Sequence, residues 1–241
     1  MRRFFIAPKR AENDTIVITG SDVRHIRDVL RMKAGDKIIA VDGSSSELTV
    51  VLTQINEEEV IGKIEKRDTL VKEPGVRITL AQSVPKADKM ELIIKMCTEL
   101  GVWEIIPVTS ERVVVQGDLS RKIERWQRIS EEAAKQSGRT IVPAIRPAEG
   151  LSTLLARLEE WDKAIMPWEV HKEKTIGKAL QGLSPKKIIL FIGPEGGYSY
   201  DEAEAAKIKG AAPVTLGNRI LRVETAAPVA VTLIMNHLGE M

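Results

Sequence analysis

The sequence predicts an α/β protein in two parts, a small β-barrel-like module followed by a mainly parallel sheet covered by helices. Three observations carry this prediction. The first seventy or so residues are mostly short β-branched or alternating segments, Glu73-Pro74-Gly75 marks a boundary, and the remainder alternates strands with helices. Such alternation is typical of a parallel sheet with helices on its faces. We therefore place the first domain at residues 1–72 and the second at residues 73–241.

The first module is predicted to hold four strands and one helix. The expected strands are residues 15–19, 37–41, 47–55 and 60–65. The segment 42–46, Asp-Gly-Ser-Ser-Ser, predicts a turn between the second and third strands. Apolar residues recur at helical spacing between Ser21, which is the expected cap, and Gly35, which is the expected end.

The second part alternates six predicted strands with six predicted helices. The expected strands are 76–82, 104–108, 141–145, 163–166, 187–192 and 214–216. The expected helices are 86–100, 120–137, 151–158, 175–180, 199–210 and 226–238. Ser199 and Glu202 form a capping-box pattern, and Thr225 is the expected cap of the last helix, with Pro228 in its first turn. That last helix is apolar nearly all round, so it is buried either in its own domain or in a homodimer interface, which we favour.

Composition excludes several classes of protein. With 43% hydrophobic and 29% charged residues, the 241-residue chain fits an ordinary globular protein. The single cysteine, Cys97, excludes an intrachain disulfide, and His25, His171 and His237 show no metal-binding spacing, so we expect no metal. The apolar part of the N-terminus is too short for a signal peptide, and no stretch approaches the roughly 20 apolar residues of a membrane span. We expect a cytoplasmic protein without membrane contact.

Basic residues are unevenly distributed although the net charge is only +2. Residues 1–10 carry four basic side chains and no acid, and residues 120–146 carry seven basic side chains against three acidic ones. Such patches bind phosphates selectively, or they are simply solvated helix faces.

Two glycine-bearing turns near the end of the chain are the strongest functional signal. Residues 193–197, Gly-Pro-Glu-Gly-Gly, follow a buried strand, but they match neither a dinucleotide turn nor a phosphate loop. The second turn is Gly217-Asn218-Arg219. The residues after it, Ile220 and Leu221, are apolar although they lie in a loop, so they either pack into the core or line an apolar pocket. Arg222 and Glu224 lie among these apolar residues. The two charged residues either steer charge in a reaction or form a structural ion pair.

These two segments closely resemble the knotted SPOUT class of S-adenosyl-L-methionine-dependent methyltransferases. Within that class, the resemblance is to the enzymes that methylate N3 of a uridine in 16S ribosomal RNA. The segments that carry it are 193–197 and Leu216-Gly217-Asn218-Arg219-Ile220-Leu221-Arg222-Val223-Glu224-Thr225-Ala226. Supporting matches, which extend it over nearly the whole chain, are residues 2–5, 25–31, 98–102, 110–112 and 125–139.

The resemblance implies a PUA-like RNA-binding β-barrel at residues 1–72 and a parallel-sheet domain with a C-terminal trefoil knot at residues 73–241. It implies a homodimer that acts on 16S ribosomal RNA or on the assembled small ribosomal subunit. It also implies a cofactor site that holds S-adenosyl-L-methionine and is formed by Met166, Pro167, Ile192, Gly193, Gly197, Leu216, Gly217, Ile220 and Leu221.

For the reaction, we expect Arg222 to stabilise the uridine anion and Glu224 to accept the N3 proton or to orient Arg222. The residues expected to bind RNA phosphates are Arg2, Arg3, Arg24, Arg27, Arg31, Arg125 and Arg139. Two alternatives stay open: a non-catalytic RNA-binding factor of ribosome assembly, and, disfavoured by the missing dinucleotide fingerprint, a nicotinamide-dependent oxidoreductase.

Overall fold

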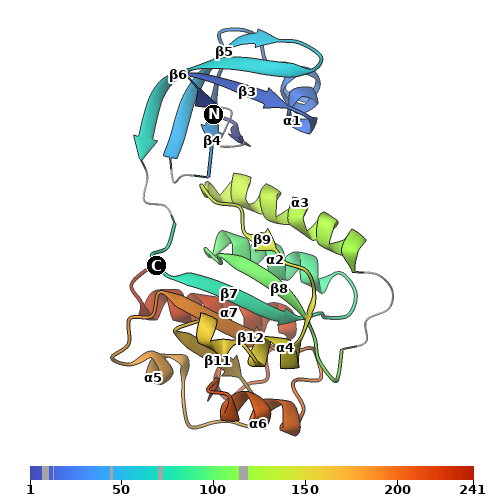
Figure 1. Ribbon diagram of the computed structural model, residues 1–241, viewed down its shortest axis with the longest axis vertical. Coiled ribbons are helices and arrows are strands. Elements are labelled where there is room, and N and C mark those ends of the chain that lie inside the picture. The colour runs from blue at the N-terminus through green and yellow to red at the C-terminus, as the bar shows by residue number, and fades with distance from the viewer. Residues whose placement is uncertain (7–10, 13, 44–45, 70–72, 114–118) are drawn as a thin grey trace. The chain divides into compact units, whose positions relative to one another are not determined.

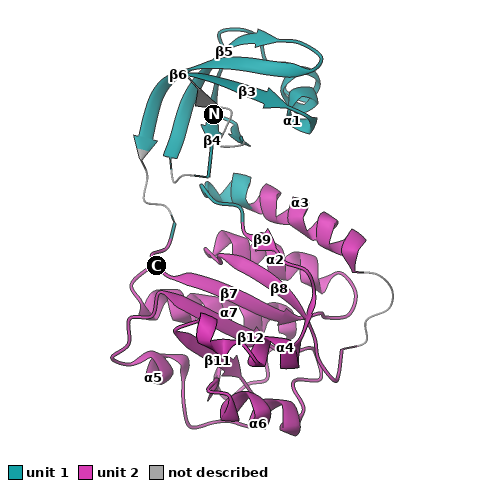
Figure 2. Cartoon of the chain, viewed as in Figure 1, with its two compact units in different colours: residues 1–73, 134–142 teal, residues 74–133, 143–241 magenta. Residues whose placement is uncertain are grey.

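The computed structural model describes residues 1–6, 11–12, 14–43, 46–69, 73–113 and 119–241. The chain divides into two compact units (Figure 2). The first contains residues 1–73 together with 134–142, and the second contains residues 74–133 and 143–241. The first unit thus includes a segment that we had placed in the second part of the chain. Residues 70–72, next to the expected domain boundary, and residues 44–45 of the expected turn lie outside the described part of the structure.

The first unit is built on a six-stranded sheet with the order β1-β4-β5-β6-β3-β2. The strands are β1 (Arg3–Phe5), β2 (Ala11–Glu12), β3 (Thr15–Thr19), β4 (Lys37–Val41), β5 (Ser46–Ile55) and β6 (Glu59–Thr69). β1 pairs with β4 in parallel, and the other pairs are antiparallel. All four predicted strands are confirmed, and their alternate residues fill one core that includes Ile16, Ile38 and Val50.

The helical segment of the first unit is shorter than predicted. α1 (Ser21–Arg24) continues into a π-helical turn, η2 (His25–Val29). The prediction that Ser21 caps the helix is wrong, because Gly20 occupies the cap with a φ of 78° and no side chain caps the first turn. The helix stops before Gly35 because Arg31 adopts a left-handed φ of 53°, which no continuing helix allows.

The second unit contains a parallel sheet of seven strands with the order β10-β8-β7-β12-β11-β13, and β9 pairs with β8. The strands are β7 (Arg77–Ser83), β8 (Glu104–Thr109), β9 (Ala144–Ile145), β10 (Glu149–Gly150), β11 (Lys163–Pro167), β12 (Lys187–Ile192) and β13 (Ala212–Val214). Every pairing is parallel, which confirms the predicted α/β class. β9 covers only the end of the predicted strand 141–145.

Helices cover both faces of this sheet (Figure 1). They are α2 (Lys89–Glu99), α3 (Ser120–Ser137), α4 (Leu151–Leu155), the 3₁₀ turn η3 (Leu158–Glu160), α5 (Ile176–Leu180), α6 (Tyr200–Ile208) and α7 (Val223–His237). Leu80 and Leu190 of the sheet pack with α2, α5 and α7, whereas their strand neighbours Ala81 and Phe191 pack with α4 and α6. Successive strand residues therefore serve two separate cores, which explains the continuous apolar runs of β7 and β12.

The ends of two helices bear directly on the site. The capping box of α6 is confirmed, since Ser199 Oγ accepts from the Glu202 N–H at 3.3 Å and Glu202 Oε2 accepts from the Ser199 N–H at 3.0 Å. α7 starts earlier than predicted, with Arg222 rather than Thr225 in the cap position. Thr225 and Pro228 both lie inside α7, beyond the positions expected for them, because Val223 is buried and is already helical.

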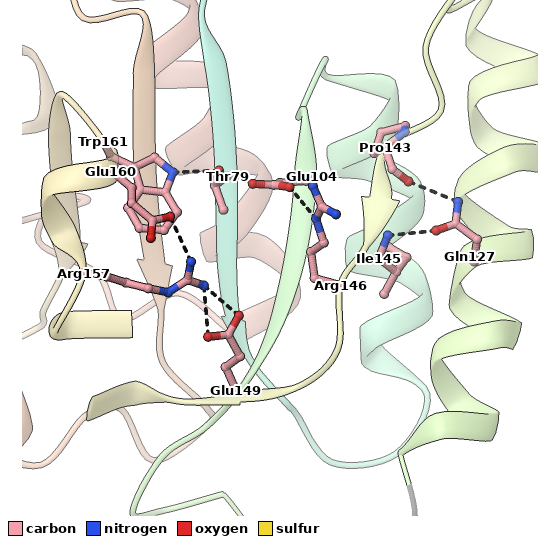
Figure 3. A network of polar contacts seen from close by, with 10 residues as sticks. All are labelled: Thr79, Glu104, Gln127, Pro143, Ile145, Arg146, Glu149, Arg157, Glu160 and Trp161. Carbon is pink, nitrogen blue, oxygen red and sulfur yellow. Dashed lines mark hydrogen bonds and ion pairs between the residues drawn. The ribbon is translucent and has the colours of Figure 1, made fainter. Parts of the chain in front are cut away.

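Polar contacts link strands of this sheet to the segments that connect them (Figure 3). Arg146 Nε lies 2.7 Å from Glu104 Oε2, and Arg157 Nη2 lies 2.8 Å from Glu149 Oε1. The Trp161 indole N–H donates to Thr79 Oγ1 at 2.9 Å. The first two contacts hold the connections around β8 and β10, and the third joins β7 to the segment before β11. No described helix is long and apolar enough to cross a membrane.

Candidate active site

A cavity of about 430 Å³ opens in the second unit, where β11, β12 and β13 end. β11 ends at Pro167, β12 at Ile192 and β13 at Val214, and the segments after them wall the cavity. Because parallel strands end at the same edge of a sheet, three segments far apart in the sequence meet here. Ligands of open α/β sheets bind in such crevices beyond the carboxyl ends of the strands.

The cavity brings together most of the residues that we had assigned to the cofactor. Eight of those nine line it: Pro167, Ile192, Gly193, Gly197, Leu216, Gly217, Ile220 and Leu221. Met166 does not line it. Its side chain is 1% exposed and belongs to the core cluster between the sheet and helices α4 and α6.

Two glycines of the turn after β12 have specific steric reasons to be glycine. A Cβ on Gly193 would lie 3.3 Å from the carbonyl carbon of Gly197 and from the backbone nitrogen of Tyr198. Gly197 has a φ of 67°, and a Cβ there would lie 2.6 Å from Oε1 of Glu169, which also lines the cavity. The turn therefore folds back on itself at one glycine and approaches the opposite wall at the other.

The apolar residues of the second loop divide between core and cavity. Val223 is 4% exposed and packs into the core beside α2. Ile220 is 88% exposed and Leu221 is half-buried, and both line the cavity. This loop offers an apolar surface for a flat, apolar part of a ligand.

Arg222 and Glu224 lie at the beginning of α7. Arg222 lines the cavity and is exposed, whereas the Glu224 side chain is 19% exposed. Among the described ion pairs, Glu224 is paired with Lys89 at 3.7 Å rather than with Arg222. Its Oε2 atom is buried and has no hydrogen-bond partner in the described part of the chain. The geometry thus leaves the Arg222 guanidinium available to a ligand.

Lys89 is a cavity residue that the sequence did not reveal. It is the first residue of α2, and its ammonium donates to Glu195 Oε1 at 3.0 Å. That hydrogen bond raises the pKa of Lys89. Burial alone would raise the pKa of the Glu195 carboxyl. The hydrogen bonds that it accepts, above all from Lys89 and also from the Lys86 N–H, outweigh burial and hold the pKa below its usual value. The only sequence signal for Lys89 was its position just after the end of β7.

Other cavity residues were missed as well, because they have no motif. Trp168 and Glu169 follow β11 directly, and Tyr198 also lines the cavity. Burial raises the pKa of Tyr198, which is 2% exposed. Arg112 Nη1 donates to the Gly196 carbonyl at 2.5 Å and so holds the turn after β12 from outside.

The seven arginines expected to bind RNA fall into four groups, of which Arg139 forms the last. Arg2, Arg24 and Arg31 are exposed side chains of the first unit. Arg3 and Arg27 are partly buried and paired, Arg3 with Glu47 and Arg27 with Asp28 at 2.7 Å. Arg125 of the second unit is exposed, although it pairs with Glu91 at 2.9 Å.

Arg139 has a different environment from the other six. It is 5% exposed, and its Nη2 donates to Glu73 Oε2 at 2.6 Å. The other oxygen of Glu73 accepts from the backbone N–H groups of Thr140, at 2.8 Å, and Ile141, at 3.0 Å. The expectation that Arg139 contacts RNA therefore has no support in this geometry: its charge is used inside the first unit, and we leave it out of the proposed RNA surface.

No cluster of metal-binding side chains occurs among the residues that the structure describes. Cys97 is fully buried, and burial raises the pKa of its thiol.

The second unit is a parallel α/β sheet with a glycine-walled cavity at its strand ends, and the first unit is a separate β-sheet. Family comparison identifies the class of protein that combines these two units. Residues 72–235 match the RNA methyltransferase domain, and residues 18–65 match the RNA methyltransferase PUA domain. The chain therefore belongs to the RNA methyltransferase family.

Individual relatives are similar over nearly their whole length. The ribosomal RNA small subunit methyltransferase E of Bacillus subtilis is 33% identical over 245 residues, which cover 97% of this chain and 96% of the relative. The crystal structure of the Neisseria gonorrhoeae enzyme of that name, bound to S-adenosyl methionine, has a TM-score of 0.86 and 34% identity, covering 98% of this chain and 97% of that one. A Legionella pneumophila methyltransferase in complex with the same cofactor has a TM-score of 0.87 and 26% identity, covering 97% and 96%.

Proposed function

We propose that this protein transfers a methyl group from S-adenosyl-L-methionine to N3 of a uridine in 16S ribosomal RNA. The observation that carries the proposal is the cavity at the strand ends, which eight of the nine predicted cofactor residues line together with Arg222. The Bacillus subtilis and Neisseria gonorrhoeae relatives, whose names state methylation of small-subunit ribosomal RNA, support the same substrate.

The residues of the cavity fit the cofactor. Its volume of about 430 Å³ suits a ligand of nucleoside size. Ile220 and Leu221 offer an apolar surface to an adenine ring, and Gly193 and Gly197 leave room where side chains would intrude. When bound, S-adenosyl-L-methionine supplies a methyl group on a sulfonium, whose sulfur leaves as a neutral thioether.

The residues of the chain must then manage the proton and the charge on the uridine. Loss of the N3 proton leaves negative charge on O2, N3 and O4 of the base. The Arg222 guanidinium, exposed at the cavity wall, stabilises that charge as N3 attacks the methyl carbon. Glu224 accepts the proton or orients Arg222, and its unbonded Oε2 has the free acceptor capacity that either role requires.

We further propose that residues 1–72 act as the RNA-binding module and residues 73–241 as the catalytic domain. Arg2, Arg24 and Arg31 are exposed and suit phosphate contacts, and Arg3, Arg27 and Arg125 require their present carboxylate partners to yield. The three loops that wall one cavity are consistent with a trefoil knot in the C-terminal segment.

A homodimer in the cytoplasm completes the proposal. α2 and α7 pack against each other, and each leaves a large leucine exposed, Leu92 at 47% and Leu233 at 42%. Exposed leucines on two helices that pack together suit an isologous interface between two copies of the chain.

The test is mass spectrometry of ribosomal RNA nucleosides from cells that lack the protein. We expect N3-methyluridine to disappear and to return with the wild-type chain and with Lys207→Ala, an exposed control on α6 that does not line the cavity. Arg222→Ala should not restore it, although the purified variant still binds S-adenosyl-L-methionine. Unchanged N3-methyluridine in the deletion would refute the function. Failure of the wild-type protein to bind the cofactor would instead favour a non-catalytic assembly factor.

A further inference from the structure

Lys89 joins segments that follow different strands of the sheet. It begins α2, which follows β7, while Glu195 lies in the turn after β12 and Glu224 lies in the first turn of α7. The Lys89 ammonium lies 3.0 Å from Glu195 Oε1 and 3.7 Å from Glu224 Oε2. One cation thus lies between two carboxylates that belong to the two glycine-bearing segments of the cavity.

The two carboxylates are held unequally. Glu195 Oε1 accepts hydrogen bonds both from Lys89 and from the Lys86 N–H at 3.1 Å, so it is anchored from two sides. Glu224 Oε2 lies beyond hydrogen-bond distance of Lys89 and is buried without a hydrogen-bond partner in the described structure. A buried carboxylate oxygen without a hydrogen-bond partner depends on nearby positive charge to stay in place.

We propose that Lys89 is a positioning residue of the methyl-transfer site. Anchored by Glu195, its ammonium holds the Glu224 carboxylate in its orientation at the beginning of α7, next to Arg222. The proposal rests on the proposed function, because it assumes that Glu224 and Arg222 serve the reaction. It adds to Arg222 and Glu224 a charged residue contributed by α2, which lies outside the segments that follow β11, β12 and β13.

The test compares Lys89→Met, Lys89→Arg and Lys95→Met in the full-length protein. Methionine keeps the length and apolar stem of the side chain but removes the charge. Arginine restores a cation that reaches both carboxylates, and Lys95 is an exposed control on the same helix. Methyl transfer from radiolabelled S-adenosyl-L-methionine to undermethylated small subunits gives kcat and KM. Calorimetry gives the cofactor Kd, and thermal unfolding confirms that each variant is folded.

We expect Lys89→Met to lower kcat about 10- to 100-fold, as misplacement of a reacting group does, while the cofactor Kd stays nearly unchanged. Lys89→Arg should recover most of kcat, and Lys95→Met should behave as wild type. In a Glu224→Gln background, Lys89→Met should have little further effect, because Lys89 acts through that carboxylate.

An unchanged kcat in Lys89→Met would overturn the inference. Equal losses in Lys89→Met and Lys89→Arg, or full additivity with Glu224→Gln, would also overturn it. If the wild-type protein itself does not methylate small subunits, the proposed function fails, which is a distinguishable result.

Discussion

The substitution Gly197→Ala tests whether the turn after β12 shapes the cofactor cavity. Gly197 has a φ of 67°, and an L-residue in this left-handed region costs about 1–2 kcal/mol. Gly182 provides a matched control. Its φ is 73°, a Cβ there would meet nothing within 4 Å, and it does not line the cavity. Both substitutions therefore carry a similar backbone cost, but only one of them intrudes on the cavity.

The structure sets the size of the difference between the two variants. A Cβ at Gly197 would lie 2.6 Å from Oε1 and 3.1 Å from Oε2 of Glu169. Non-bonded carbon contacts are optimal near 3.5–4 Å, so the carboxylate must move by about 1 Å. Glu169 is exposed and flexible, so it moves rather than unfolding the turn. We expect a loss of cofactor affinity of about tenfold, which corresponds to ~1.4 kcal/mol.

Calorimetric titration with S-adenosyl-L-methionine and thermal unfolding measure the two effects separately. Both variants should melt about 2–8 °C below wild type, which is 1–2 kcal/mol for a chain of this size. Gly182→Ala should keep its cofactor Kd within about twofold of wild type. If Gly197→Ala binds the cofactor as tightly as Gly182→Ala, the assignment of this turn to the cofactor is refuted.

Three further predictions concern other parts of the molecule. Glu73→Gln should destabilise the protein by about 3 kcal/mol at pH 7, because Arg139 loses a buried carboxylate partner. Burial raises the pKa of Glu73, but hydrogen bonds, chiefly from Arg139, hold it below its usual value. The wild-type advantage is therefore full above the unfolded pKa of about 4.3 and fades as pH falls through the lower folded value, which denaturant titrations across pH will show. Arg24→Ala and Arg31→Ala should each weaken binding to ribosomal RNA and reduce the slope of log K against log salt by about 1, as fluorescence titrations at several salt concentrations measure. Leu233→Glu should shift the protein from dimer to monomer in sedimentation equilibrium, because it places a charge in the proposed interface.

Each of these three has an outcome that contradicts it. A pH-independent difference between wild type and Glu73→Gln would show that the carboxylate charge is not what stabilises the first unit. An unchanged salt slope would remove Arg24 and Arg31 from the RNA surface. A Leu233→Glu protein that remains dimeric would place the interface elsewhere, and a wild-type monomer would refute the dimer itself.

The fold was predictable from the sequence wherever local pattern decided the structure. The buried run 187–192 and the basic helix 120–137 have the predicted bounds. The strands that were missed are too short for any periodicity, such as β1 and β10, which have three and two residues. Strands of this length form because a neighbouring strand offers backbone partners, a tertiary effect that local sequence does not record.

The site was predictable where glycines and apolar loop residues adjoin in sequence, but not where charges meet across the fold. The partners of Arg139 and Lys89 lie far away in the sequence, since Arg139 is 66 positions from Glu73 and Lys89 is 106 positions from Glu195. A count of basic residues along a window therefore placed Arg139 on an RNA surface, although the fold buries it. Because the partner of Lys89 is also distant in the sequence, nothing distinguished Lys89 from the exposed charged residues of α2.

The strand order explains why such distant residues form one site. β7, β12, β11 and β13 are consecutive neighbours in the sheet, and the chain that leaves each of them supplies part of the cavity. After β7 comes Lys89, and after β13 comes the loop that leads to Arg222. The segments after β7 and β13 lead into α2 and α7, which share one core, whereas the turn after β12 leads into α6, which packs in the other core. Side chains that bridge these segments therefore help to set their relative positions. Lys89 bridges two of them with one ammonium, and for this reason a change of charge there should alter catalysis before it alters folding.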